Sequence, residues 1–301
     1  MISESYRQFI VTMHGDEGRE WLDRLPGLIE RCVRRWGIEH AQPVNELSYN
    51  FVATGTRSDN TPVVVKIGIP TREFWTELDA LRIFDGKGSV QLLDDWPEAG
   101  AMLLEWVVPG HTLTSVDDDE TATRIAANVM RTLWRPEPAE HRFPTVQHWA
   151  LGFDRLRKRF GGGTGPLPRQ AVDQAEAIFA DLLEDAAEPA LLHGDLHHMN
   201  ILRGEGGWVT IDPKGVIGEP AYETGALFRN PIPEVFSWTD LQSKTERRLA
   251  ILSEELGFDR QRLRDWGIAQ AVLSAWWDIE DTNNTSKQWL LIAEALSAAR
   301  V

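Results

Sequence analysis

The hydrophobic pattern of the chain changes its period several times, and each change marks a predicted element. Between residues 17 and 36, apolar side chains recur every three or four positions, which predicts a helix that ends at Gly37. Pro26 falls inside this stretch, so we expect a kink or two short helices. Residues 44–55 and the β-branched run 62–68 instead predict two strands.

One more helix, two strands and then mainly helices follow. Residues 71–84 carry an apolar helical face, and strands are expected at 90–93 and 101–106 with a turn between them. Beyond this point the predicted helices are 117–134, 146–160, 169–186, 239–256, 259–278 and 283–300. These elements indicate an α+β protein in which the sheet comes first.

A predicted hairpin within residues 191–214, LLHGDLHHMNILRGEGGWVTIDPK, carries the strongest chemical signal. Asp195 and Asn200 share a short loop, and the glycine-rich turn at 204–207 folds a second strand back so that Asp212 returns to the same volume. The pattern H-x-D-L-x-x-x-N matches the catalytic loop of protein kinases, in which a metal-binding Asp follows. The sequence therefore predicts that three oxygen-bearing side chains converge.

Phosphoryl transfer would explain this spacing. Asp195 would orient an acceptor hydroxyl and take its proton, while Asn200 and Asp212 would supply oxygen ligands for Mg²⁺. Two other interpretations stay open. His193 and His197 are four residues apart and could ligate a transition metal, although a loop rather than a helix is predicted here. Alternatively, the histidine is a core residue and the acids face water, which leaves their register unexplained.

A lysine on the second predicted strand fits the same chemistry. Lys66 lies in the run V-V-V-K-I, which matches the V-A-I-K of kinases, where the Lys contacts ATP phosphates. A lone Lys near a strand end is common, so it is the downstream hairpin that favours a phosphate role. Glu73 and Glu77 on the following helix are the candidates to pair with Lys66.

The nucleotide-covering loop of kinases has no complete G-x-G-x-x-G counterpart in this chain. We expect Ser48, Tyr49 and Asn50 to provide a hydroxyl, an amide and backbone N–H groups to the phosphates instead. The last predicted strand leaves through E-W-V-V-P-G, which is similar to a kinase hinge. Backbone groups near Glu105 and Val107 are therefore expected to bond the edge of adenine.

The composition of the chain limits which classes of binding partner are expected. The 301-residue chain has a formal net charge of −15, which argues against a nucleic-acid or anionic-membrane partner and suits a cationic substrate, although solvated acidic faces would give the same number. Cys32 stands alone on the apolar face of the first helix, so no intrachain disulfide is expected. No signal peptide or membrane-spanning run is apparent, so we expect a cytoplasmic protein with access to ATP.

The stretches HGDLHHMNIL and IDPKGVIGEPAYE resemble the aminoglycoside phosphotransferase family, kinase-like enzymes that phosphorylate small hydroxylated molecules. The second stretch, with Arg229-Asn230-Pro231 after it, is most similar to the streptomycin 6-phosphotransferase branch, also called the aminoglycoside/hydroxyurea resistance kinases. The resemblance implies a bilobal protein-kinase-like fold, with a nucleotide-binding lobe (1–105) and a larger helical lobe (106–301), and ATP and Mg²⁺ as cofactors. H-G-D stands in place of the H-R-D of protein kinases, and IDPKG in place of D-F-G.

In related aminoglycoside kinases the C-terminal helices supply an acidic acceptor pocket, which here would bind a cationic aminoglycoside, streptomycin first. The candidates are Trp277, Asp278, Glu280 and Asp281, with Glu219 after the hairpin. Carboxylates bind guanidinium groups through paired hydrogen bonds, and indole faces attract cations. Alternatively, these acids cap a helix and face water, with a tryptophan in the core.

The same resemblance favours Glu77 over Glu73 as the partner of Lys66, and it gives His193 a bracing rather than a reactive role. Two other functions would share this fold and catalytic loop. One is a kinase for another metabolite, such as choline, homoserine or a sugar, and the other is a nucleotide-binding pseudo-enzyme. Only the acceptor pocket can separate the first from an aminoglycoside kinase.

Overall fold

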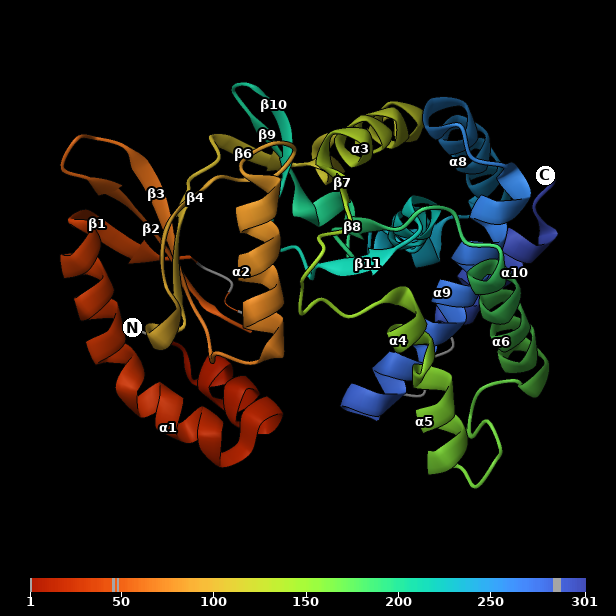
Figure 1. Ribbon diagram of the computed structural model, residues 1–301, viewed down its shortest axis with the longest axis horizontal. Coiled ribbons are helices and arrows are strands. Elements are labelled where there is room, and N and C mark those ends of the chain that lie inside the picture. Colours follow the sequence, from red (N-terminus) through yellow and green to blue (C-terminus); the bar gives the residue numbers. More distant parts are fainter. Residues whose placement is uncertain (1, 45–46, 48, 284–287) are drawn as a thin grey trace. The chain divides into compact units, whose positions relative to one another are not determined.

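The computed structural model describes residues 2–44, 47, 49–283 and 288–301. The chain divides at Gly110 into two units, residues 1–110 and residues 111–301 (Figure 1). Within the described ranges, no helix combines the length and hydrophobicity needed to span a membrane.

A five-stranded antiparallel sheet of order β1-β2-β3-β5-β4 forms the centre of the N-terminal unit. Its strands are β1 (Ile38–Pro43), β2 (Phe51–Arg57), β3 (Pro62–Ile67), β4 (Leu92–Trp96) and β5 (Ala101–Glu105), and a short turn η1 (Pro97–Ala99) joins the last two. The pattern predicted β3 and β5 closely, but it missed β1 and placed the start of β2 too early. β1 leaves most of its side chains exposed, so it lacks the apolar alternation that a half-buried strand shows.

Helix α1 (Glu4–Trp36) begins well before the predicted residue 17. Ser3 caps its first turn, since the Ser3 hydroxyl accepts from the N–H of Tyr6 (3.2 Å). The helix bends at Gly15, whose φ of 57° is not helical, and it passes through Pro26 without ending. The segment before Gly15 buries few side chains, which is why its apolar period was too sparse to predict a helix.

The two faces of this sheet have different partners. Val63, Val65 and Ile67 of β3 lie in one buried cluster with the apolar residues of α1, including Cys32. Because alternate side chains of a strand point to opposite faces, Lys66 points away from that cluster and contacts α2 (Arg72–Phe84). The sheet therefore separates the α1 core from the face that carries the lysine.

The unit of residues 111–301 is mainly helical. Its helices are α3 (Asp119–Leu133), α4 (Val146–Ala150), α5 (Gly152–Arg159), α6 (Arg169–Glu184), α7 (Gly225–Phe228), α8 (Leu241–Leu256), α9 (Arg260–Thr282) and α10 (Gln288–Ala298). The single helix predicted at 146–160 is two helices, because the N–H of Leu151 bonds the carbonyl of His148 (3.3 Å), three residues back, and the turn tightens there.

Helix α9 is the central element of this unit. It is buried almost continuously from Leu263 to Ile279 and packs against α5, α6, α7, α8 and α10, and its contacts with α6 and α10 can be followed in Figure 1. It runs past the predicted end at residue 278 as far as Thr282. A helix that is apolar on most of its faces has to be enclosed by others, so α9 provides the frame on which the neighbouring elements are placed.

Short strands and turns complete the unit and carry the predicted chemical motif. The strands are β6 (Pro109–Thr112), whose first two residues belong to the first unit, β7 (Arg135–Pro136), β8 (Ala190–Leu192), β9 (Ile201–Gly204), β10 (Gly207–Thr210) and β11 (Val216–Gly218). The turns are η2 (Leu113–Ser115), η3 (His198–Asn200), η4 (Pro220–Thr224) and η5 (Glu234–Ser237). They form the sheets β10-β9-β6 and β11-β8-β7. The residues between β8 and β9, 193–200, are named the HGD loop below.

Candidate active site

The hairpin of β9 and β10 brings the two ends of the predicted motif together. Its strands pair antiparallel with Ile201 opposite Thr210, and the N–H of Ile211 donates to the carbonyl of Asn200 (3.0 Å). Asp212 therefore leaves the hairpin next to the residue at which the hairpin begins. The backbone thus returns as the glycine-rich turn predicted, and the convergence of the three side chains stays a prediction.

Inside the HGD loop, the side chain of Asn200 is turned toward Asp195. Its Nδ2 donates to the backbone carbonyl of Asp195 (3.0 Å). The Nε2 atom of His197 lies 3.8 Å from Oδ2 of Asp195 and 3.4 Å from Nδ2 of Asn200. Because the amide nitrogen of Asn200 faces the loop, its Oδ1 is the atom left for a ligand. The side chain of Asp195 is 36% exposed and can be reached from solvent.

Asp212 has an unusual backbone conformation for a residue other than glycine, with φ at 58°. The left-handed region costs an L-residue roughly 1–2 kcal/mol, and such strain gathers at functional sites. Two residues later, the N–H of Lys214 donates to the carbonyl of His193 (2.8 Å). This bond ties the chain after Asp212 back to the start of the HGD loop.

His193 braces the loop with both ring nitrogens. Its Nε2 lies 2.8 Å from the carbonyl of Ile211 and donates to it, while its Nδ1 accepts from the N–H of Asp195 (3.2 Å). Complete burial lowers the pKa of His193 to about 4, so the imidazole is neutral at pH 7. With both nitrogens in use, His193 cannot serve as a transition-metal ligand without giving up one of these bonds.

Gly194 explains why this loop departs from the H-R-D of protein kinases. Its φ is 85°, and a Cβ atom at this position would lie 2.8 Å from Cη2 of Trp149 and 3.0 Å from Cγ1 of Val216. A side chain would therefore be strained by the backbone and would also collide with two neighbours. The indole of Trp149 occupies the space that the missing side chain leaves.

Glu223 of η4 is the most important site residue that the sequence analysis missed. Its carboxylate, on a side chain only 2% exposed, accepts from the N–H of His193 (2.6 Å) and from the N–H of Gly194 (2.9 Å). Burial raises the pKa of Glu223 to about 7, and the two backbone N–H groups oppose that rise. An acid inside the otherwise apolar run around A-Y-E-T-G-A-L-F was the available signal.

The N-terminal unit supplies the predicted ion pair. The Nζ of Lys66 lies 2.5 Å from Oε1 of Glu77, and both side chains are buried. Glu73, the other candidate, is exposed. Of the two predicted candidates, Glu77 is therefore the one that pairs with Lys66.

The other residues predicted to bind the nucleotide make contacts within the protein that do not by themselves indicate a nucleotide site. Tyr49 is exposed, and its ring packs edge-on against Phe9 at 5.2 Å, while a Cβ at Gly68 would meet Oδ1 of Asn50. Ser48 lies outside the described residues. In the predicted hinge, the N–H of Glu105 is already bonded to the carbonyl of Gln91 (3.0 Å), and the carboxylate of Glu105 accepts from the N–H of Gln91 (3.2 Å). Val107 is buried.

Comparison with known proteins decides the family. Residues 35–282 match the model of the "Aminoglycoside/hydroxyurea antibiotic resistance kinase" family. The chain is 30% identical over 305 residues to the streptomycin 6-kinase of Streptomyces griseus, covering 98% of this chain and 95% of that protein. The chain belongs to this family of kinases. The predicted resemblance to the streptomycin 6-phosphotransferase branch is therefore confirmed.

Two further similarities extend the comparison. The hydroxyurea phosphotransferase of Kitasatospora aureofaciens is 31% identical over 281 residues, covering 89% of this chain and 77% of that protein. A thermostable mutant of the aminoglycoside phosphotransferase APH(4)-Ia, in a ternary complex with ADP and hygromycin B, superimposes with a TM-score of 0.61 at 16% identity, covering 90% of this chain and 99% of that one. The predicted kinase-like α+β fold is confirmed, and a kinase of this family takes its phosphoryl group from a nucleotide.

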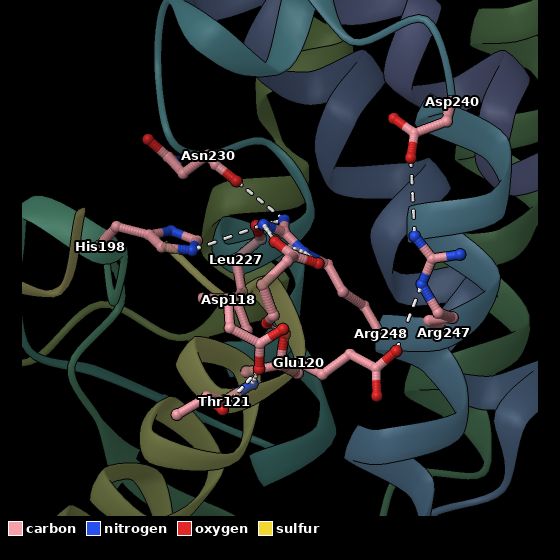
Figure 2. A network of polar contacts seen from close by, with 11 residues as sticks. Asp118, Glu120, Thr121, His198, Leu227, Asn230, Asp240, Arg247 and Arg248 are labelled. Carbon is pink, nitrogen blue, oxygen red and sulfur yellow. Dashed lines mark hydrogen bonds and ion pairs between the residues drawn. The ribbon is translucent and has the colours of Figure 1, made fainter. Parts of the chain in front are cut away.

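A buried arginine holds the HGD loop of this kinase from behind (Figure 2). Arg248 of α8 donates to both carboxylate oxygens of Asp119 and to the carbonyls of Leu227 (2.7 Å) and Asn230 (2.8 Å). Its Nη2 also lies 3.5 Å from Nε2 of His198, a loop residue that burial keeps neutral by lowering its pKa to about 2. One side chain from α8 thus connects α3, α7 and the HGD loop.

A second arginine of the kinase, Arg229, is also buried. Its guanidinium makes long bonds of 3.4 Å to the carbonyl of Gly225 and to Oε1 of Gln270, and it lies over the ring of Trp289 at 5.8 Å. Burial lowers the pKa of Arg229, and the charge of Asp195 opposes that shift. Arg229 therefore adds positive potential behind the HGD loop.

Glu219 forms an ion pair that connects the turn after β11 to helix α9. Arg262 of α9 pairs with it through both guanidinium and carboxylate forks, with Nη2 2.7 Å from Oε2, and the indole N–H of Trp266 donates to the same oxygen (3.2 Å). Arg262 also donates to the carbonyls of Leu182 (3.3 Å) and Asp185 (2.7 Å). Both carboxylate oxygens are occupied and the side chain is buried, so this geometry argues against the acceptor role predicted for Glu219.

The acids near the C-terminal end of α9 differ in how far neighbouring side chains already occupy them. Glu280 forms a two-pronged pair with Arg155 of α5 (2.7 and 2.9 Å), so it is committed to a neighbour. Asp278 is half-buried and accepts from the hydroxyl of Thr282 (3.2 Å), and Asp281 is exposed. Trp277 is half-buried, with its ring perpendicular to that of Trp149 at 5.7 Å. Of the predicted cluster, Trp277 and Asp278 are half-buried, and Trp277 is the member that contacts Trp149.

Proposed function

We propose that this kinase transfers the γ-phosphoryl group of ATP to a hydroxyl of a cationic aminoglycoside, with streptomycin as the first acceptor to test. The observation that supports the reaction type is the β9–β10 pairing, which returns the chain at Asp212 to the end of the loop that holds Asp195 and Asn200. The similarity over nearly the whole chain to a protein named streptomycin 6-kinase supports the acceptor. The acidic net charge of −15 agrees with a cationic acceptor.

Asp195 acts as the base in this proposal. Its accessible carboxylate orients the acceptor hydroxyl, and the hydroxyl oxygen attacks the γ-phosphorus as the bond to the ADP oxygen breaks. The hydroxyl proton passes to Asp195. The loop is held rigidly by His193, Glu223 and Arg248, which fits a reaction that depends on positioning.

Asn200 and Asp212 would hold Mg²⁺. The Oδ1 of Asn200 and the carboxylate of Asp212 are hard oxygen donors, which Mg²⁺ prefers, and the strained backbone of Asp212 fits a functional position. The described residues contain no group of three or more His, Cys, Asp or Glu side chains that could hold a metal ion. This agrees with a cation that shares its ligands with nucleotide phosphates and water. When bound, Mg²⁺ neutralises phosphate charge.

Lys66, braced by Glu77, would give a point charge to the nucleotide phosphates in the lobe predicted as residues 1–105. Tyr49 and Asn50 would cover the phosphates from the loop before β2, and backbone groups around Glu105 and Val107 would bind adenine. Residues 106–301 would supply the HGD loop and the acceptor-binding side chains. Trp277 and Asp278 remain the proposed acceptor contacts from α9.

The test is phosphorylation of a panel of acceptors by purified protein, followed by mass spectrometry and by ADP release. Streptomycin should gain a phosphoryl group. Asp195→Ala should lower the rate by about 10²–10⁴-fold while nucleotide binding is kept. Asp154→Asn, an exposed acid on α5, is the matched control and should match wild type. A variant at Asp195 that retained more than roughly a tenth of the rate would remove the base assignment.

The metal assignment has its own test. Asp212→Asn should weaken nucleotide binding in the presence of Mg²⁺ and leave metal-free binding almost unchanged, because the carboxylate acts mainly on the cation. If Mg²⁺ affects ATP affinity equally in both proteins, Asp212 is not a metal ligand. The acceptor panel should include hydroxyurea, since a hydroxyurea phosphotransferase is similarly related, together with choline and homoserine. Turnover of a neutral acceptor alone would leave only the kinase assignment standing.

A further inference from the structure

Trp149 of α4 lies against the residue that precedes the proposed base. Its Cη2 occupies the space beside Gly194, where a Cβ would approach to 2.8 Å. Consecutive Cα atoms are about 3.8 Å apart, so this edge of the indole is within reach of any molecule that presents a hydroxyl to Asp195. Trp149 as a whole residue is half-buried.

The turn of chain that carries Trp149 is fastened to its neighbours at several points. Thr145 caps α4 by accepting from the N–H of His148 (3.0 Å), and it also bridges to Ile217 of β11. The N–H of Ile217 donates to the carbonyl of Pro144 (2.9 Å), so the start of α4 is fastened to the strand that follows Asp212. A ring carried on such a turn can align a ligand as well as contact it.

Trp149 also connects the HGD loop to the end of α9. Its ring is perpendicular to that of Trp277 at 5.7 Å and lies 6.0 Å from that of Tyr222. Asp278, half-buried, follows Trp277 directly. Trp149 therefore contacts Gly194, next to Asp195, on one side and Trp277, next to Asp278, on the other.

This surface suits a cationic ring. The face of an indole attracts ammonium and guanidinium groups more strongly than the ring of phenylalanine does. Aliphatic side chains offer the same apolar area without this attraction. A cationic sugar that lies on Trp149 would have its charge stabilised by the ring and its hydroxyl beside the base.

We propose that Trp149 is the acceptor platform of this kinase, a specificity-determining residue that binds the charged amino- or guanidino-sugar ring through its indole face. The inference rests on the proposed function, because it takes an aminoglycoside as the acceptor. The competing explanation is that the indole only supports the HGD loop by filling the space at Gly194. The two explanations differ in which kinetic constant changes.

The experiment measures streptomycin KM, ATP KM and acceptor-independent ATP hydrolysis for wild type, Trp149→Leu and Trp149→Phe. Trp149→Leu keeps apolar bulk and removes the ring, so streptomycin KM should rise about ten-fold, with ATP KM and ATP hydrolysis within two-fold of wild type. Trp149→Phe keeps a weaker aromatic face and should fall between them. Leu151→Ala, two residues away and exposed, is the matched control and should leave every constant unchanged.

Footprinting of the unaltered protein provides a second measurement that does not depend on a variant folding. Hydroxyl-radical oxidation, located by mass spectrometry, should decrease at Trp149 when streptomycin saturates the protein. Met13 of α1, which is 38% exposed and lies outside the proposed site, serves as the internal reference and should not change.

The outcomes distinguish a failure of the proposed function from a failure of the role proposed for Trp149. If wild type phosphorylates no aminoglycoside, the proposed function fails. If wild type is active but Trp149→Leu keeps the wild-type streptomycin KM, or raises both KM values together, the platform is overturned and the function stands. Unchanged oxidation of Trp149 with bound streptomycin overturns it as well.

Discussion

Two ion pairs of this kinase each hold a buried carboxylate, and they differ in geometry. Lys66 and Glu77 join neighbouring elements, β3 and α2, whereas Arg262 and Glu219 join α9 to the turn after β11. In the second pair the guanidinium fork is also bonded to two backbone carbonyls, and the carboxylate also accepts from Trp266. A planar fork with fixed partners makes a structural joint, while an ammonium group is a compact charge that can also serve a ligand.

The difference shows that burial and charge alone do not mark a functional acid. Glu219 lies closer in sequence to the hairpin than any other acceptor candidate, yet its carboxylate is fully engaged. Replacing both members of each pair is the sharpest way to test this distinction, because removing one member leaves an unpaired buried charge.

The largest effect is expected for the double variant Lys66→Met with Glu77→Gln. It leaves no buried charge unpaired, so the melting temperature should stay near that of wild type. The proposed phosphate contact is lost, so kcat/KM for ATP should fall on the order of 10²–10³-fold. Calorimetry and steady-state kinetics measure the two quantities. Near-normal turnover would make this pair structural too and would erase the comparison.

Arg262→Met should affect stability and spare chemistry. A buried carboxylate that loses its cation costs about 3–5 kcal/mol, which corresponds to a fall in melting temperature of roughly 10 °C. Adding Glu219→Gln should restore most of that loss, with streptomycin KM unchanged. A raised streptomycin KM in the double variant, with ATP KM unchanged, would return Glu219 to the acceptor site.

Glu223 extends the comparison to a buried carboxylate that is held by backbone N–H groups. Glu223→Gln can accept only one of the two bonds from His193 and Gly194, so we expect kcat to fall about ten-fold through misplacement of the loop. An unchanged kcat would show that one bond is enough to hold the loop.

The pH dependence of stability tests the same residue. The folded-state pKa of Glu223, about 7, lies above its ordinary value of 4.5, so the folded protein holds this proton more tightly. Its contribution to stability is full below pH about 4.5 and is lost as the pH rises through about 7. The melting temperature should therefore fall more between pH 5 and pH 8 in wild type than in Glu223→Gln. Identical slopes would contradict the raised pKa.

The smallest effect is expected at the exposed pair of Arg155 and Glu280. Partly solvated ion pairs contribute about 0–1 kcal/mol, so Glu280→Gln should change the melting temperature by no more than a few degrees. Streptomycin KM should also stay constant, since Glu280 is already paired with Arg155. A several-fold rise in streptomycin KM would show that this carboxylate is shared with the acceptor.

Elements with a regular apolar period could be predicted, and those without one could not. The boundaries of α3, α6 and α8 followed their patterns closely. Residues 4–16 and β1 were missed, since few of their side chains are buried, and the break at Leu151 was missed although Gly152 follows it. Glu223 was missed because its function depends on backbone N–H groups that lie 29 and 30 residues away in the chain.

The sequence by itself determined the hairpin that returns the chain at Asp212 to the loop of Asp195 and Asn200, because a short glycine turn and antiparallel pairing are local and leave little freedom. It also determined the family, through motifs within a few dozen residues. Only the tertiary structure decided which acids are occupied by arginines, which side chain fills the space at Gly194 and which carboxylate holds the HGD loop. Those contacts join residues far apart in the chain, and their geometry is fixed by how helices pack around α9.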